Sequence, residues 1–138
     1  GWAKPVQINP GSYKSRKVGT VLVSLAGPLV NYLLAFLGLL LYVAVSMAGY
    51  RGDWFYYLAV INIGLGTFNL IPVPPLDGSH VLEELVPGVR GFYGRVGRFA
   101  MPILVLCLYT GILREPLNLV NDAVLGAMVR AALAIFGV

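Results

Sequence analysis

The sequence predicts an all-α, polytopic membrane protein with about four transmembrane helices. Of its 138 residues, 58% are hydrophobic and 12% are charged, with a mean hydropathy of +0.79. Several apolar runs approach the roughly 20 residues that a helix needs to cross a bilayer. One run ends in a cluster of three prolines, which break a helix because proline lacks the amide donor and clashes with the preceding turn. The lipid bilayer is therefore the first expected partner.

Residues 1–19 are predicted to form a loop at the membrane surface, because basic residues alternate there with prolines and glycine. The first membrane helix is predicted over 20–47. Its small and polar residues recur every three or four positions: Ser24, Gly27, Asn31, Ala35 and Gly38. Small side chains let helices approach closely in lipid, and an amide can hydrogen-bond across the contact. This stripe is expected to face another helix.

A second helix is predicted over 54–71, with aromatic residues at its start as interfacial anchors. Asn62, Gly66 and Asn69 follow the spacing i, i+4 and i+7, so they share one face of that helix. We expect this face to pack against Gly27 and Asn31 of the first helix.

The remaining chain is predicted as a proline motif and polar connection over 72–98, then helices over 99–113 and 117–138 joined by a turn at 114–116. The last segment either spans the membrane or lies on it, and we favour the span. Lysine and arginine concentrate in residues 1–19 and 72–98, which predicts that both connections face the cytoplasm. The net charge of +4 is small and scattered, so no nucleic-acid partner is expected. The single cysteine, Cys107, excludes an internal disulfide.

The stretch Asn69–Gly78 combines the three prolines with an acid and a glycine. Asp77 follows the broken helix and has apolar sequence on both sides. An acid at membrane depth is costly and marks a functional site by default; alternatively, Asp77 caps a helix that runs from Gly78 to Leu85. The residues alone leave these two roles open. His80 could join Asp77 in a two-ligand metal patch, but a surface role is preferred.

Three stretches stand out in order along the chain. They are Gly1-Trp2-Ala3-Lys4-Pro5-Val6, Ala26-Gly27-Pro28-Leu29-Val30-Asn31 and Asn69-x-x-Pro72-x-Pro74-Pro75-Leu76-Asp77-Gly78. Together they resemble the site-2 protease family of intramembrane zinc metalloproteases. The resemblance implies that Asp77 is the third ligand of a catalytic zinc ion. It also implies active-site or substrate-binding support from five residues: Asn31, Asn69, Pro72, Pro74 and Gly78.

The family's H-E-x-x-H signature, which supplies two histidine ligands and a glutamate base, is absent from this chain. The resemblance implies that it precedes Gly1, so that this chain holds no catalytic residue and is inactive alone. The implied function is zinc-dependent cleavage of transmembrane segments of other membrane proteins, in a bacterial or archaeal cell membrane. Two rivals stay open: a non-catalytic or truncated homologue that binds membrane partners, and a small ion transporter or channel subunit built around the broken helix.

Overall fold

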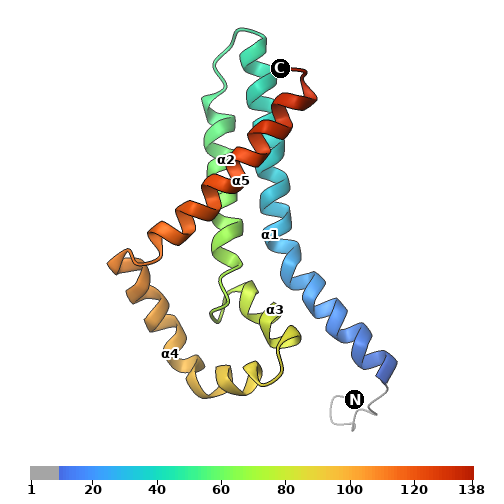
Figure 1. Cartoon of the computed structure of the whole chain (residues 1–138), viewed down its shortest axis with the longest axis vertical. Coiled ribbons are helices and arrows are strands. Elements are labelled where there is room, and N and C mark those ends of the chain that lie inside the picture. Colours follow the sequence, from blue (N-terminus) through green and yellow to red (C-terminus); the bar gives the residue numbers. More distant parts are fainter. Residues whose placement is uncertain (1–9) are drawn as a thin grey trace.

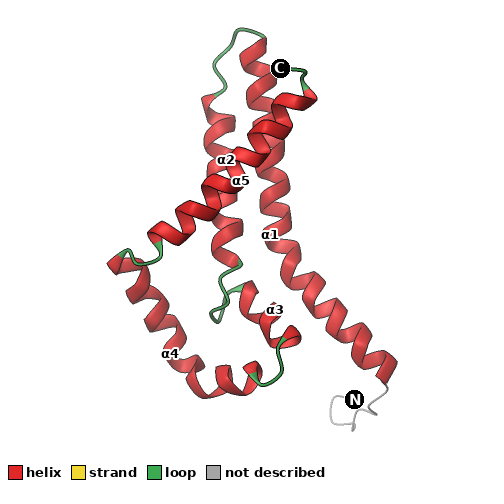
Figure 2. Ribbon diagram, viewed as in Figure 1, coloured by secondary structure: helices red, strands yellow, loops and turns green. Residues whose placement is uncertain are grey.

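The computed structural model describes residues 10–138, with side chains from Lys14 onward, and every regular element in that range is a helix (Figure 2). The helices are α1 (Pro10–Met47), α2 (Asp53–Asn69), α3 (Asp77–Leu85), α4 (Val89–Thr110) and α5 (Arg114–Ile135). The all-α fold class predicted from the sequence is therefore confirmed.

Three helices form a bundle around a small core. α1 and α2 run antiparallel and side by side, and α5 crosses both of them (Figure 1). The buried core consists of Ala35, Leu39, Val43, Ala59, Ile63 and Ala132. Half of these residues are alanines, because helices that approach this closely leave little room for side chains. We call α1, α2 and α5 the three-helix bundle.

Glycines set the close approach of α1 and α2. A Cβ atom added at Gly38 would lie 2.9 Å from the Phe55 carbonyl oxygen of α2. One added at Gly66 would lie 3.2 Å from the Pro28 carbonyl oxygen and 3.3 Å from the Asn31 Cβ of α1. The expected contact between the two small-residue stripes is therefore confirmed at Gly66 and Asn31. It is wrong at Gly27, where an added Cβ would meet Asp77 of α3 and, among the described residues, no atom of α2 within 4 Å.

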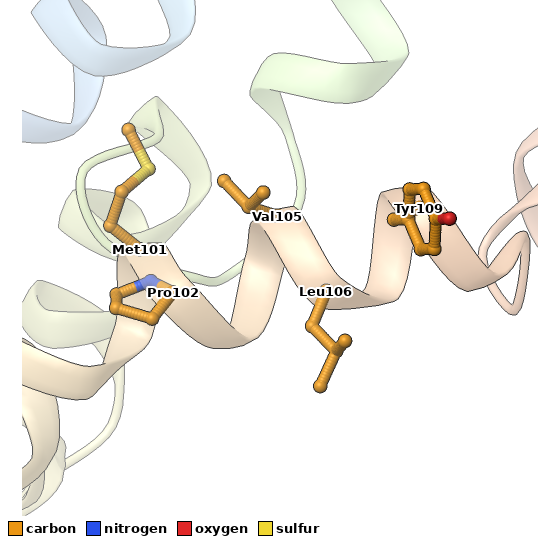
Figure 3. A pocket seen from close by; sticks show the side chains of 5 residues that line it. All are labelled: Met101, Pro102, Val105, Leu106 and Tyr109. Atoms are coloured by element: carbon orange, nitrogen blue, oxygen red, sulfur yellow. The ribbon is translucent and has the colours of Figure 1, made fainter.

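The rest of the described chain is far more open. Residues 70–76, which we call the proline loop, lead through α3 into α4, and α4 bends away from the bundle before the chain returns along α5 (Figure 1). Among the described helices, α4 packs mainly against α3 and has at most isolated contacts with the others. One face of α4 carries an apolar hollow of about 650 Å³, lined by Met101, Pro102, Val105, Leu106 and Tyr109 (Figure 3). We call the proline loop, α3 and α4 the open arm.

Several boundaries differ from those predicted. α1 begins at Pro10, so residues 10–19 are helical rather than a surface loop, since proline fits a first helical turn, where its missing amide is not needed. The polar connection also contains helix: α3, and the first ten residues of α4 (89–98). The turn lies at 111–113, where Gly111 has a φ of +77°, and residues 114–116 begin α5. The Gly1–Val6 stretch lies outside the described residues.

Length and composition allow three of these helices to cross a membrane: α1, α4 and α5. α2 has 17 residues, which at about 1.5 Å per residue falls just short of the roughly 30 Å hydrocarbon core. Large apolar side chains on α1, α2, α4 and α5 point outward, including Leu33 at 63% and Ile61 at 59% exposure. Such faces suit contact with lipid. The number of spans stays a prediction.

Candidate metal centre at the proline loop

The proline loop begins where α2 can no longer continue. The last turn is tighter than an α-helical turn, because its hydrogen bonds reach back three residues. Leu70 N–H donates to the Thr67 carbonyl and Ile71 N–H to that of Phe68. The prolines that follow supply no amide donors, and the Pro74–Pro75 peptide bond is cis. Leu76 N–H closes the loop on the Val73 carbonyl at 2.9 Å, and α3 starts at the next residue. The predicted break after α2 is thus confirmed.

Gly78 lies where the two ends of this loop come into contact. A Cβ atom at this position would collide with the Leu70 carbonyl group and would lie 2.7 Å from the carbonyl oxygen of Ile71. Any side chain would therefore clash with the backbone at the end of α2. From the sequence we expected Gly78 to permit a sharp turn after Asp77. The structure gives another reason for the glycine: it lies inside α3 and allows two stretches of backbone to touch.

Asp77 lies in the first turn of α3 and faces α1. A Cβ atom added at Gly27 would lie 3.1 Å from Asp77 Oδ2, so the glycine of α1 leaves the space that the carboxylate occupies. The residue is half-buried. The N-cap of α3 is Leu76, and no side chain makes a capping hydrogen bond there. The capping role considered for Asp77 is therefore not formed, and its carboxylate has no hydrogen-bond or ion-pair partner among the described residues.

The amides near this site behave differently from expectation. Asn62 and Asn69 donate to carbonyls of their own helix, those of Leu58 at 2.9 Å and Leu65 at 3.0 Å. The side-chain hydrogen bond between α1 and α2 instead joins Tyr32 Oη and Thr67 Oγ1 at 2.8 Å. The sequence pattern does not single out this pair, because tyrosine and threonine fit an apolar helix face as well as a polar one.

The other residues expected to support the site lie on α1 and in the proline loop. Asn31 is half-buried beside Gly66, one turn along α1 from Gly27. The Pro72 carbonyl accepts a hydrogen bond of 2.5 Å from Tyr93 Oη of α4. Pro74 is half-buried in the loop. Which of these residues support chemistry stays a prediction.

The donors present fit one part of a metal site. Within residues 10–138, no three His, Cys, Asp or Glu side chains gather closely enough to hold a metal ion. His80 is exposed on α3. A catalytic zinc takes three protein ligands as a rule, so Asp77 fits the role of a single carboxylate ligand and no more. An apolar pocket of about 220 Å³ lies behind the loop, lined by Leu25, Leu70, Pro72, Gly78, Val81, Leu82 and Leu85.

Comparison with known proteins finds similarity to zinc metalloproteases. The model of peptidase family M50 matches residues 47–110. YwhC of Bacillus subtilis, named as a candidate zinc metalloprotease, is 34% identical over 91% of this chain and 64% of its own length. A zinc metalloprotease of Methanocaldococcus jannaschii is 32% identical over 57% of this chain and 23% of its own length.

A shorter match comes from Brucella suis, where a protein named as a candidate zinc metalloprotease is 45% identical over 33% of this chain and 13% of its own length. The chain thus spans less than two thirds of the length of these relatives. No solved structure matches the chain significantly. By its sequence, the chain is similar to members of peptidase family M50, the site-2 protease family, which its three motifs also resemble.

Proposed function

We propose that this chain forms the aspartate side of the zinc centre of an intramembrane metalloprotease, with Asp77 as the zinc ligand that it contributes. The other two zinc ligands, both histidines, and the glutamate base come from outside these 138 residues. The observation that carries the proposal is the placement of Asp77. Its carboxylate is half-buried against Gly27, lacks a partner among the described residues, and follows the proline loop.

Electrostatics supports a cation at this position. A carboxylate that is partly removed from water and unpaired is unfavourable, and a divalent cation offsets that cost because it supplies the missing counter-charge. Within the described residues, the ion pairs lie elsewhere, at Arg51–Asp53 and between Arg90 and the glutamates of α3. Asp77 is therefore the acid of this region that remains available to a metal ion.

The surrounding residues keep this carboxylate in place. Gly27 leaves room for the side chain, and Gly78 lets α3 start against the end of α2. The three prolines restrict the φ angles of the loop, so the start of α3 has little freedom. When bound, zinc would supply a hydrolytic nucleophile near neutral pH by lowering the pKa of a coordinated water to about 7.

The proposed substrates are transmembrane segments of other membrane proteins. A helix that enters such a site must expose backbone, and that backbone needs hydrogen-bond partners away from water. Asn31 is half-buried beside the seam between α1 and α2, and Asn69 stands at the start of the proline loop. Both amides have donor and acceptor capacity for an unwound peptide. The proposed setting is a bacterial or archaeal cell membrane.

Replacement of Asp77 by asparagine in the intact protein tests the proposal. Asp77→Asn keeps the shape but removes the charge. Zinc content and cleavage of a transmembrane substrate are expected to fall by more than the roughly 10–100-fold typical of an outer-shell partner. Asp122→Asn on the exposed part of α5 is the matched control and should leave both unchanged. If Asp77→Asn retained full zinc content and cleavage, the proposal would fail.

A further inference from the structure

We infer that Tyr93 of α4 is a positioning residue for the proposed metal centre, because its hydroxyl holds the proline loop that carries Asp77. This inference rests on the proposed function and adds to it a residue that lies outside the three family-like motifs. Tyr93 Oη donates to the Pro72 carbonyl at 2.5 Å, across 21 residues of sequence.

The proline loop needs an external hydrogen-bond donor. Pro72, Pro74 and Pro75 have no amide hydrogen. The loop therefore has few backbone donors with which to form internal hydrogen bonds. Its internal hydrogen bonds are those of Val73 N–H to Ile71 and of Leu76 N–H to Val73. Few backbone amides are therefore available to hold the loop in place. Tyr93 satisfies the Pro72 carbonyl and ties it to a different helix.

The loop transmits this restraint to Asp77 because it is closed at its base. Gly78 lies against the carbonyls of Leu70 and Ile71, so the two ends of the loop touch. Two ends that touch, with three prolines between them, leave the loop few internal motions. A restraint on the Pro72 carbonyl therefore limits the whole loop, and Asp77 is attached to its last residue.

The Tyr93 contact differs from the other ties of α4. Arg90 pairs with Glu84 at 2.7 Å and approaches Glu83 at 4.0 Å, so it anchors the start of α4 to α3. That anchor is two-thirds exposed on the arginine side and does not touch the loop. Within the described residues, Tyr93 alone supplies a side-chain hydrogen bond from α4 to the loop.

The decisive variant is Tyr93→Phe in the intact protein, which removes one oxygen atom. We expect zinc affinity, measured by competition with a chelator, to fall about 10-fold, within the range for outer-shell partners. Cleavage should lose kcat by a similar factor with KM nearly unchanged, because substrate binding is not touched. Incorporation of 4-aminophenylalanine at position 93, which restores a donor on the ring, should recover both values.

Two matched variants separate positioning from general effects. Tyr109→Phe alters a tyrosine of the same helix that is 89% exposed, and should change nothing. Arg90→Gln removes the ion pairs of α4 without touching the loop, and should affect zinc affinity less than Tyr93→Phe does. Thermal unfolding in detergent reports whether each variant is folded.

The outcomes distinguish this inference from the function on which it rests. If Asp77→Asn abolishes zinc binding but Tyr93→Phe matches the parent in zinc affinity and kcat, the positioning role is wrong and the protease proposal stands. If Tyr93→Phe loses zinc only in proportion to a lost folded fraction, or the amino analogue fails to recover it, the inference is also overturned. If the parent protein neither binds zinc nor cleaves, both proposals fall.

Discussion

The three-helix bundle and the open arm use similar apolar residues but hold together in different ways. In the bundle, Gly38 and Gly66 lie against backbone of the facing helix, and alanines make up half of the core. In the arm, Gly91, Gly94 and Gly97 recur every three residues along α4, yet a Cβ atom at any of them would meet nothing within 4 Å. A row of glycines therefore becomes a helix contact only where a partner helix is present to use it.

The difference has a consequence for the candidate site. The bundle fixes α1 and the end of α2 through close backbone contacts, whereas the arm is tied down by a few polar groups, chiefly Tyr93 and Arg90. Asp77 lies at the junction, with Gly27 of the bundle on one side and the loop of the arm on the other. The two sides of Asp77 are therefore held differently, by close backbone contacts in the bundle and by a hydrogen bond and ion pairs of side chains in the arm.

The largest difference between the two regions is expected when one glycine in each is replaced by a larger residue. Gly38→Leu should lower the free energy of unfolding in detergent by about 3 kcal/mol, the upper end for overpacking, because the Phe55 carbonyl is backbone and cannot swing aside. Gly94→Leu should instead leave stability unchanged or raise it by up to about 1 kcal/mol through helix propensity. Equal destabilisation by both would show that α4 packs against the protein after all.

A smaller effect is expected at the junction itself. Gly78→Ala should cost about 2 kcal/mol, within the range for overpacking, because its Cβ would collide with the carbonyls of Leu70 and Ile71. The damage should be confined to the arm. Hydrogen exchange should therefore speed up in α3 and the proline loop but stay slow at Leu39 and Ile63 of the bundle. Uniform acceleration would contradict the division into two regions.

The hydrogen bond between α1 and α2 should contribute less. Tyr32→Phe removes the hydroxyl that meets Thr67, and a typical net loss is about 1 kcal/mol. Tyr109→Phe, on an exposed face of α4, is the matched control and should have no measurable effect. Chemical unfolding of both variants measures this difference. A Tyr32→Phe protein as stable as its parent would show that this hydrogen bond does not stabilise the bundle.

The smallest effect on stability is expected at Gly27, where a new side chain would meet the movable end of the Asp77 side chain rather than backbone. Gly27→Leu should change the free energy of unfolding by no more than about 0.5 kcal/mol, as is usual for substitutions outside the core. Zinc content in the intact protein should nevertheless fall sharply, because the carboxylate loses its place. A stability loss like that of Gly38→Leu would instead place Gly27 in the seam between α1 and α2.

Local chemistry makes several features of this protein predictable from its sequence. The hydropathy of the runs predicted helices suited to a membrane, and the three prolines predicted where α2 must end, because both depend on residues that act on their own backbone. The three motifs, in their order, resemble the site-2 protease family, and the comparisons find the same similarity. Helix boundaries were predicted less well: the basic residues of 14–17 and of 90–98 resemble a surface loop in composition, yet they lie on helices that continue past the apolar segment.

The sequence alone thus determined the helical class and the break at the proline loop, and its resemblance to the site-2 protease family pointed to Asp77 as a candidate ligand. Only the tertiary structure decided which groups meet. It placed Asp77 against Gly27, gave Gly78 a contact with the Leu70 carbonyl, directed Asn62 and Asn69 to their own helix, and brought Tyr93 to Pro72. The physical reason is that hydropathy and proline act within one continuous segment of the chain, whereas hydrogen-bond partners and close contacts depend on how segments distant in sequence pack together.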